Sequence, residues 1–272
     1  MRTYHAGMRF EVPPAIAEHL ADWSGEVVAP RDAATVLLLR DRPGGLEVFL
    51  LHRRAALAAF GGMTVFPGGR VDPLDAGEVP WSGPDPASWP LGASPELSRA
   101  LVCAAVREMF EEAGVLLAGP SPGQVVDDVS GPDWAAERIA LEAHETHLAA
   151  LLDRRGLVLR ADLLRPWAHW ITPIQERRRF DTRFFVAALP AGQATAETTG
   201  EADSLGWERP ADALAAVERG EYVMVPPTAI SLAELAGYDT VVDVLAAADQ
   251  RQVVPVTPLL VAEPGGVRFE LP

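Results

Sequence analysis

Short apolar runs of strand length alternate with longer segments of helical periodicity along this 272-residue chain. AATVLLLRD (33–41) and LEVFLLHR (46–53) surround a DRPGG turn, a pattern that indicates a β-hairpin. Further strands are expected at MTVFPGGRVD (63–72), WAHWITPI (167–174), TRFFVAAL (182–189) and EADSLGWE (201–208). Strands and helices mixed in this way bury their apolar faces most readily when the strands form one compact sheet that the helices cover. This pattern predicts an α/β fold.

The expected helices have recognisable ends. Ser94 and Pro95 form a typical helix start, apolar residues recur through LSRALVCAAVREMF, and Gly114 is a typical stop. Three more helical segments are expected at 132–155, 209–220 and 226–249. Residues 76–94 contain seven Gly or Pro among nineteen, which predicts a loop, and VVPVTPLLVA with VRFEL predicts a terminal strand pair. The expected organisation is a lead-in at 1–32, a main domain at 33–250 with a loop insertion at about 76–94, and a C-terminal strand extension at 251–272.

The charge of the chain excludes one class of partner. With a formal net charge of −15, the chain lacks the basic surface that a nucleic-acid backbone requires. No segment approaches the roughly 18–20 apolar residues of a membrane span, and the ends of the sequence match neither a signal peptide nor a peroxisomal address. Cys103, the single cysteine, lies in an apolar helical run and is expected to be a small buried hydrophobe in a reducing compartment. The cytoplasm is therefore the expected location.

The helix that stops at Gly114 gathers carboxylates in its last turn. REMFEEAGV (107–115) places Glu108, Glu111 and Glu112 at i, i+3 and i+4, so their side chains lie on one face. Acidic groups at this end oppose the helix dipole by roughly 0.3–1 kcal/mol each, and Arg107 is the one basic residue of the segment. We infer that a cation completes the group, because clustered carboxylates suit hard ions such as Mg²⁺ or Mn²⁺. A solvated acidic helix face is the alternative.

The residues before the helix extend this pattern. VFPGG (65–69) is a glycine turn whose unhindered backbone N–H groups suit a phosphate, and Asp75 follows Gly69 by six residues. Together with the helix, this stretch resembles the Nudix box, G-x5-E-x7-R-E-U-x-E-E-x-G-U, in which U is apolar. The matching residues are Gly69, Arg107, Glu108, Met109, Glu111, Glu112, Gly114 and Val115. Asp75 stands where the box has its first Glu, and 31 residues instead of seven separate it from Arg107, so the box is interrupted by the Gly/Pro-rich loop.

An interrupted box resembles the branch of the Nudix hydrolase superfamily that includes the peroxisomal (acyl-)coenzyme A diphosphatase. The resemblance is carried by VFPGGRVDPLD, EEAGVLL, WAHWITPIQERRRFDTRFF and MVPPT and spans roughly residues 33–250. It implies an α/β/α sandwich with a mixed sheet, which would make 33–250 a Nudix domain. It also implies metal-dependent cleavage of coenzyme A or acyl-coenzyme A into 3′,5′-ADP-type and 4′-phosphopantetheine products.

Two other activities are compatible with the same resemblance. One is an ADP-ribose or dinucleotide pyrophosphatase, and the other is a non-catalytic Nudix-fold ligand sensor. In each case the implied partner is a small nucleotide-derived molecule, with neither nucleic acid nor membrane. A homodimer is left open.

The resemblance also implies roles for single residues. Glu108, Glu111 and Glu112 would ligate Mg²⁺ or Mn²⁺, and Arg107 would orient them. Many relatives carry a further carboxylate on a distant loop or strand, as metal ligand or general base, and here Glu201 would take that role, with Glu197 and Asp203 as substitutes. The expected substrate-binding residues are Arg54, Gly68, Gly69, Arg178 and Arg179.

The reasons for the last set differ from residue to residue. Arg54 fits the start of a motif found upstream of the glycine turn in coenzyme A Nudix enzymes. Arg178 and Arg179 lie in the polar turn between two expected strands, where guanidinium groups would suit bidentate contact with phosphate. In the preceding strand, Trp167 and Trp170 are three residues apart, which predicts that they face opposite sides of the sheet.

Overall fold

The computed structural model describes residues 23–53, 62–196, 202–263 and 266–271. In this part of the chain, the strands of the main sheet are β1 (Arg31–Arg42), β2 (Gly45–Arg53), β3 (Thr64–Val65), β4 (Gly68–Arg70), β8 (Leu164–Ile171), β9 (Phe180–Ala188), β10 (Ala202–Glu208) and β11 (Pro255–Val256). Their order is β10-β2-β1-β9-β8-β11, with β3 beside β2 and β4 beside β1. The sheet is mixed, because β1 is antiparallel to β2 but parallel to β9.

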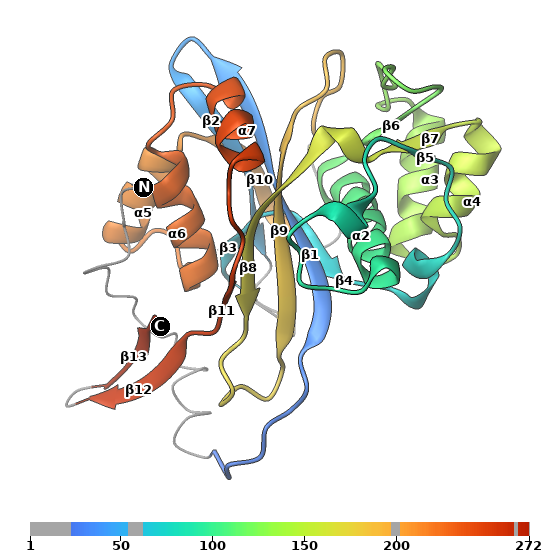
Figure 1. The fold of residues 1–272 in the computed structure, drawn as a ribbon. Helices are drawn as coiled ribbons and strands as arrows, with labels where there is room; N and C mark the ends of the chain where they lie inside the picture. Colours follow the sequence, from blue (N-terminus) through green and yellow to red (C-terminus); the bar gives the residue numbers. More distant parts are fainter. Residues whose placement is uncertain (1–22, 54–61, 197–201, 264–265, 272) are drawn as a thin grey trace.

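Helices cover both faces of this sheet. They are α2 (Pro95–Ala113), α3 (Pro132–Glu142), α4 (Leu148–Arg155), α5 (Pro210–Glu218), α6 (Pro226–Leu235) and α7 (Val241–Asp249). Figure 1 shows α2, α3 and α4 on one side and α5, α6 and α7 on the other. The predicted α/β/α sandwich is therefore confirmed. None of the helices in the described ranges is long and apolar enough to cross a membrane.

The central strand β1 explains why one apolar run can build two cores. Val36 and Leu38 belong to the hydrophobic cluster under α2, whereas Leu37 and Leu39 belong to the cluster under α6 and α7. A strand covered on both faces needs apolar residues at successive positions, so the run is nearly continuous. The predicted hairpin with the following strand is confirmed by the antiparallel pairing of β1 with β2.

Several expected segments are subdivided in the structure. The expected strand at 63–72 is split into β3 and β4, the helical region at 132–155 into α3 and α4, and that at 226–249 into α6 and α7. The terminal strand pair is confirmed as β12 (Leu259–Glu263) with β13 (Gly266–Glu270). Within the expected loop, β5 (Trp81–Ser82) pairs with β7 (Val158–Arg160), which also pairs with β6 (Ala118–Gly119).

The loop at 76–94 packs down on the molecule. Leu91 is buried, its carbonyl accepts a hydrogen bond from Nε of Arg183 at 3.1 Å, and the ring of Trp89 lies 6.1 Å from that of Phe185. At the other end of the loop, the guanidinium group of Arg99 lies over the ring of Trp81. The insertion therefore fills space between α2 and the sheet.

The prediction that Trp167 and Trp170 face opposite sides of the sheet is wrong. The register of β8 with β9 shifts between Pro166 and Ala168, which marks a β-bulge. A bulge adds one residue to the strand and reverses the facing of the residues that follow. Both tryptophans consequently belong to the cluster under α6 and α7.

Candidate active site

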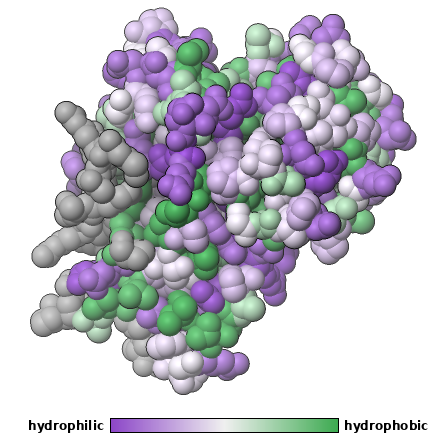
Figure 2. All heavy atoms as spheres, in the orientation of Figure 1, coloured by the Kyte–Doolittle hydropathy of each residue, from purple (hydrophilic) through white to green (hydrophobic). Residues whose placement is uncertain are grey.

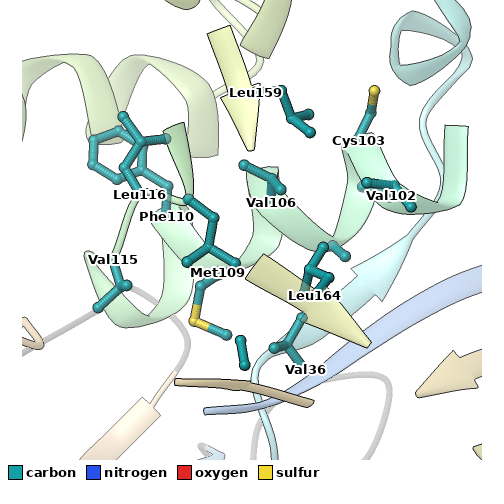
Figure 3. Close-up of a cluster of buried hydrophobic side chains, with 14 of the residues drawn as sticks. Val36, Val102, Cys103, Val106, Met109, Phe110, Val115, Leu116, Leu159 and Leu164 are labelled. Carbon is teal, nitrogen blue, oxygen red and sulfur yellow. The ribbon is translucent and has the colours of Figure 1, made fainter. Parts of the chain in front are cut away.

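Helix α2 fixes the position of the carboxylates through its apolar side. Ser94 Oγ accepts a hydrogen bond from the N–H of Leu97, and Gly114 ends the helix with a φ of 67°. Figure 3 shows that Val106 and Met109 of α2 lie close to Val36 and Leu164 in the hydrophobic cluster. Because this side is anchored in the core, the next residues around the helix are held in fixed directions. Cys103 is buried on α2 as predicted, and burial raises the pKa of its thiol to about 12.

Arg107 joins both halves of the interrupted motif. Its Nε and Nη2 each donate to Asp75 at 3.0 Å, and its Nη1 donates to Glu108 at 2.8 Å and to Glu111 at 3.2 Å. Nη2 also donates to the carbonyl of Arg70. Burial acts to lower the pKa of Arg107, but the hydrogen bond to Asp75 and the surrounding carboxylates raise it above its usual value. The long insertion separates Asp75 from Arg107 in the sequence, but the fold brings the two side chains into contact.

Glu112 connects α2 with the glycine turn. Its Oε2 accepts a hydrogen bond from the N–H of Gly68 at 2.7 Å, and its Oε1 lies 3.1 Å from Nη1 of Arg53. The N–H of Gly68 was expected to serve a phosphate, and in this structure it serves Glu112. Arg53 therefore supplies positive charge to the acidic group, a role that the sequence pattern did not indicate.

Gly69 lies directly beside the carboxylate of Glu108. A Cβ atom at Gly69 would lie about 2.5 Å from Cδ of Glu108, well inside van der Waals contact. At Gly68, a Cβ atom would meet the carbonyl of Ala34 and the side chain of Thr35. The two glycines therefore let α2 and its carboxylates pack directly on β4.

These residues line a cavity of about 340 Å³, which we call the acidic cavity. Its charged lining consists of Asp72, Glu108, Glu111, Glu112, Glu142, Arg53, Arg70 and Arg107. Burial, together with the charge of Glu108, raises the pKa of Glu111 to about 7, although the nearby Arg107 acts to lower it. Five carboxylates and three guanidinium groups leave an excess of negative charge that a divalent cation would balance.

The donor set fits such a cation in its chemistry, since all of its candidate ligands are carboxylate oxygens. In the described part of the chain, no three acidic, histidine or cysteine side chains converge to hold one ion. Glu108 and Glu111 are turned toward Arg107, and Glu112 toward Gly68 and Arg53. A bound cation would therefore compete with two arginines for these oxygens.

A second cavity, of about 180 Å³, opens beside the first and is mostly apolar. It is lined by Phe66, Trp170, Phe180, Phe184, Val225, Pro226, Pro258 and Phe269, with Arg178 and Glu176 among its polar residues. Thr35, Arg53, Gly68, Phe180 and Thr182 line both cavities, so the two lie side by side. Hydrophobic residues also gather at the surface of the molecule near β12 and β13, the hairpin that supplies Phe269 (Figure 2). We call this space the apolar cavity.

The structure places some of the predicted site residues at the two cavities and others elsewhere. Glu108, Glu111, Glu112, Arg107, Gly68 and Gly69 line the acidic cavity, and Arg178 lines the apolar cavity. Arg179 does neither: it is buried, and its guanidinium group donates to the carbonyls of Thr172, Pro173 and Val28. We therefore remove Arg179 from the substrate-binding set, because it serves to hold the turn before β9. Arg54, Glu197 and Glu201 lie outside the described residues, and Asp203 lies in β10.

Four residues of the site were missed by sequence reasoning. The spacing from Gly69 singles out Asp75 without indicating a role for it, and the upstream motif indicates Arg54 instead of its neighbour Arg53. Glu142, the last residue of α3, and His144, two residues after it, also line the acidic cavity. No signal in the sequence could have found these two, because they lie about 30 residues beyond the helix whose carboxylates they join.

Comparisons with known proteins agree with this geometry. A family model described as NUDT19 Nudix domain matches residues 93–235. The "Acyl-coenzyme A diphosphatase NUDT19" of Gallus gallus is 26% identical over 78% of this chain and 70% of that protein. The Homo sapiens protein of the same name is 27% identical over 73% of this chain and 63% of that protein, so the chain spans less than two thirds of its length.

A solved structure of a Nudix hydrolase is also similar to this chain. The "NUDIX hydrolase from Alicyclobacillus acidocaldarius" is 29% identical, with a TM-score of 0.67. The match covers 81% of this chain and 97% of that one.

Proposed function

Because this chain belongs to the Nudix hydrolase family, we propose that it hydrolyses the diphosphate bond of coenzyme A or of an acyl-coenzyme A. Water would attack one phosphorus atom, forming a new P–O bond while the bridging P–O bond breaks. The products would be a 3′,5′-ADP-type nucleotide and a 4′-phosphopantetheine, with release of a proton.

The observation that carries this proposal is that the acidic and apolar cavities lie side by side and share five lining residues. A diphosphate needs a site rich in charged groups, whereas the acyl and pantetheine portions need an extended and largely apolar one. Arg53 lines both cavities, so its guanidinium group lies where a diphosphate would meet the apolar arm. A substrate with these two unlike parts fits the whole space better than a compact dinucleotide does.

In this proposal Glu108, Glu111 and Glu112 would hold Mg²⁺ or Mn²⁺, which when bound neutralises phosphate charge and lowers the pKa of water. Arg107 keeps the carboxylates oriented through Asp75, which anchors it. Arg53 and Arg70 contribute positive charge at the wall of the acidic cavity. Gly69 leaves room for the carboxylate of Glu108 beside the turn. We also propose Arg54 as a substrate contact and Glu201 as the further carboxylate.

The apolar cavity argues for an acylated substrate. Trp170, Phe184 and Phe269 offer it aromatic surface, and each buried methylene of a bound chain contributes about 0.8 kcal/mol. Pro258 and Phe269 come from the segment after residue 250, so we assign 251–272 to the same functional unit as the domain at 33–250. Residues 1–32 would remain a lead-in to this unit.

The test is to incubate the protein with coenzyme A, octanoyl-coenzyme A, ADP-ribose and NADH, with Mg²⁺ and then with Mn²⁺, and to identify products by mass. We expect phosphopantetheine products from both coenzyme A substrates. The kcat/KM for octanoyl-coenzyme A should be about tenfold higher than for coenzyme A, because its chain buries further methylenes.

Other outcomes would reject particular parts of the proposal. Cleavage of ADP-ribose or NADH alone would indicate a diphosphatase with a different substrate, whose adenine ring would occupy the apolar cavity. Binding of these molecules without cleavage of any would favour a ligand sensor. Equal kcat/KM for the two coenzyme A substrates would exclude the acyl chain from the apolar cavity.

A further inference from the structure

The end of helix α3 is built in a way that differs from the other helices near the site. The N–H of His144 donates to the carbonyl of Leu141, and that of Glu145 donates to the carbonyl of Ala140. This arrangement is a Schellman motif, whose central residue adopts the left-handed conformation. His144 does so with a φ of 55°, and in the described part of the chain it is the one residue other than glycine with a positive φ.

Glycine is the favoured residue for such a position, because a Cβ atom makes the left-handed conformation unfavourable. The same chain uses glycine where α2 and α4 end, at Gly114 and Gly156, with φ values of 67° and 63°. Histidine at the end of α3 therefore costs stability that glycine would not. Residues kept in unfavourable backbone conformations gather at functional sites, where the surrounding structure maintains them.

The position of α3 places this exception at the acidic cavity. Arg138 of α3 donates from Nη1 to the carbonyl of Glu111 at 3.2 Å, which joins α3 to the last turn of α2. Glu142 lies one helical turn after Arg138, on the same side of α3. Glu142 and His144 line the acidic cavity together with Glu108, Glu111 and Glu112. His144 is solvent-exposed, so it is not retained to fill the core.

We propose that His144 is a substrate-binding residue that donates an imidazole N–H to the diphosphate; this rests on the proposed function. A diphosphate presents several anionic oxygens, and carboxylates outnumber guanidinium groups in the lining of the acidic cavity. Arg107 already donates to three carboxylates and a carbonyl. An imidazole carries an N–H donor whether neutral or charged, so His144 supplies a contact that glycine cannot.

The experiment compares His144→Gly, His144→Asn and the adjacent control Glu145→Gln. We expect His144→Gly to raise the melting temperature by about 2 °C, since it relieves the backbone. The same change should lower kcat/KM for octanoyl-coenzyme A roughly tenfold and raise the Kd for ADP with Mn²⁺ by a similar factor. His144→Asn should lie between wild type and His144→Gly, because asparagine tolerates the left-handed region and retains an N–H donor. Glu145→Gln should match wild type.

The readouts separate the two proposals. If His144→Gly keeps the wild-type kcat/KM and the wild-type Kd for ADP, His144 does not contact the diphosphate and the inference is wrong. If the wild type binds ADP without cleaving any coenzyme A substrate, the proposed function fails, and a weaker Kd in His144→Gly still supports the contact. A wild type that neither binds ADP nor cleaves a coenzyme A substrate overturns both.

Discussion

Replacement of Arg107 by methionine is expected to lower the free energy of unfolding by about 3–5 kcal/mol, the usual cost of removing one partner from a buried ion pair. Arg107 is 6% exposed and donates to Asp75, Glu108 and Glu111. Methionine would fill much of its volume but leave Asp75, which is 4% exposed, without its guanidinium partner. The measurement is urea-induced unfolding, in the absence of divalent ions, monitored by circular dichroism.

Arg99→Met is the matched control, because it makes the same exchange on the same helix. The guanidinium group of Arg99 lies over Trp81 at 4.4 Å from the ring centre. Such a contact contributes about 0.5–1 kcal/mol at an exposed site. In the Arg107→Met background, Asp75→Asn should recover part of the loss, since it removes the buried charge. Equal losses for Arg99→Met and Arg107→Met would contradict the role of Arg107 as the centre of the site.

Glu112→Gln is expected to lower kcat more than about 100-fold, because even the outer-shell partners of metal ligands typically contribute 10–100-fold. The amide oxygen of glutamine can still accept the hydrogen bond that Glu112 receives from Gly68. The fold should therefore survive, with a smaller loss in the free energy of unfolding than Arg107→Met, because, in the described part of the chain, Glu112 loses the ion pair with a single arginine, Arg53. The readouts are kcat for octanoyl-coenzyme A and urea-induced unfolding of the same samples.

Glu96→Gln serves as the control for this second substitution, since Glu96 is an exposed glutamate in the first turn of the same helix. It should leave kcat unchanged. Thermal stabilisation by millimolar Mn²⁺ should be seen with wild type and Glu96→Gln and be mostly lost with Glu112→Gln. A Glu112→Gln protein that is folded and turns over within tenfold of wild type would remove Glu112 from the metal-binding set.

Local signals were sufficient for the features of the fold that depend on neighbouring residues. The capped start at Ser94 and the stop at Gly114 defined α2, and the continuous apolar run defined β1 as a strand buried on both faces. The division of 132–155 was not visible, because α3 ends at Glu142 and the left-handed residue after it is His144 instead of the usual glycine. The facing of Trp167 was not visible either, since a bulge is set by pairing with β9.

Of the candidate site, the sequence predicted mainly the residues on one face of α2. Glu108, Glu111 and Glu112 lie close together in the sequence, so their shared direction follows from helical geometry. The partners of these residues come from β2, from the short helical turn after β4 and from the end of α3, and only the folded chain brings them together. Arg179 shows the converse: its place in an arginine-rich turn suggested a phosphate contact, but three backbone carbonyls occupy it.

Hydrolysis of a diphosphate at the acidic cavity leaves a defined label in oxygen-18-labelled water. Octanoyl-coenzyme A would be incubated with the protein and Mn²⁺, with a matched sample containing EDTA, and the masses of the products determined by mass spectrometry. We expect octanoyl-phosphopantetheine and 3′,5′-ADP, with one labelled oxygen in the phosphate of one product, and no cleavage in EDTA. Labelled octanoate with an intact coenzyme A diphosphate, or an uncleaved substrate in the presence of Mn²⁺, would contradict the proposed hydrolysis.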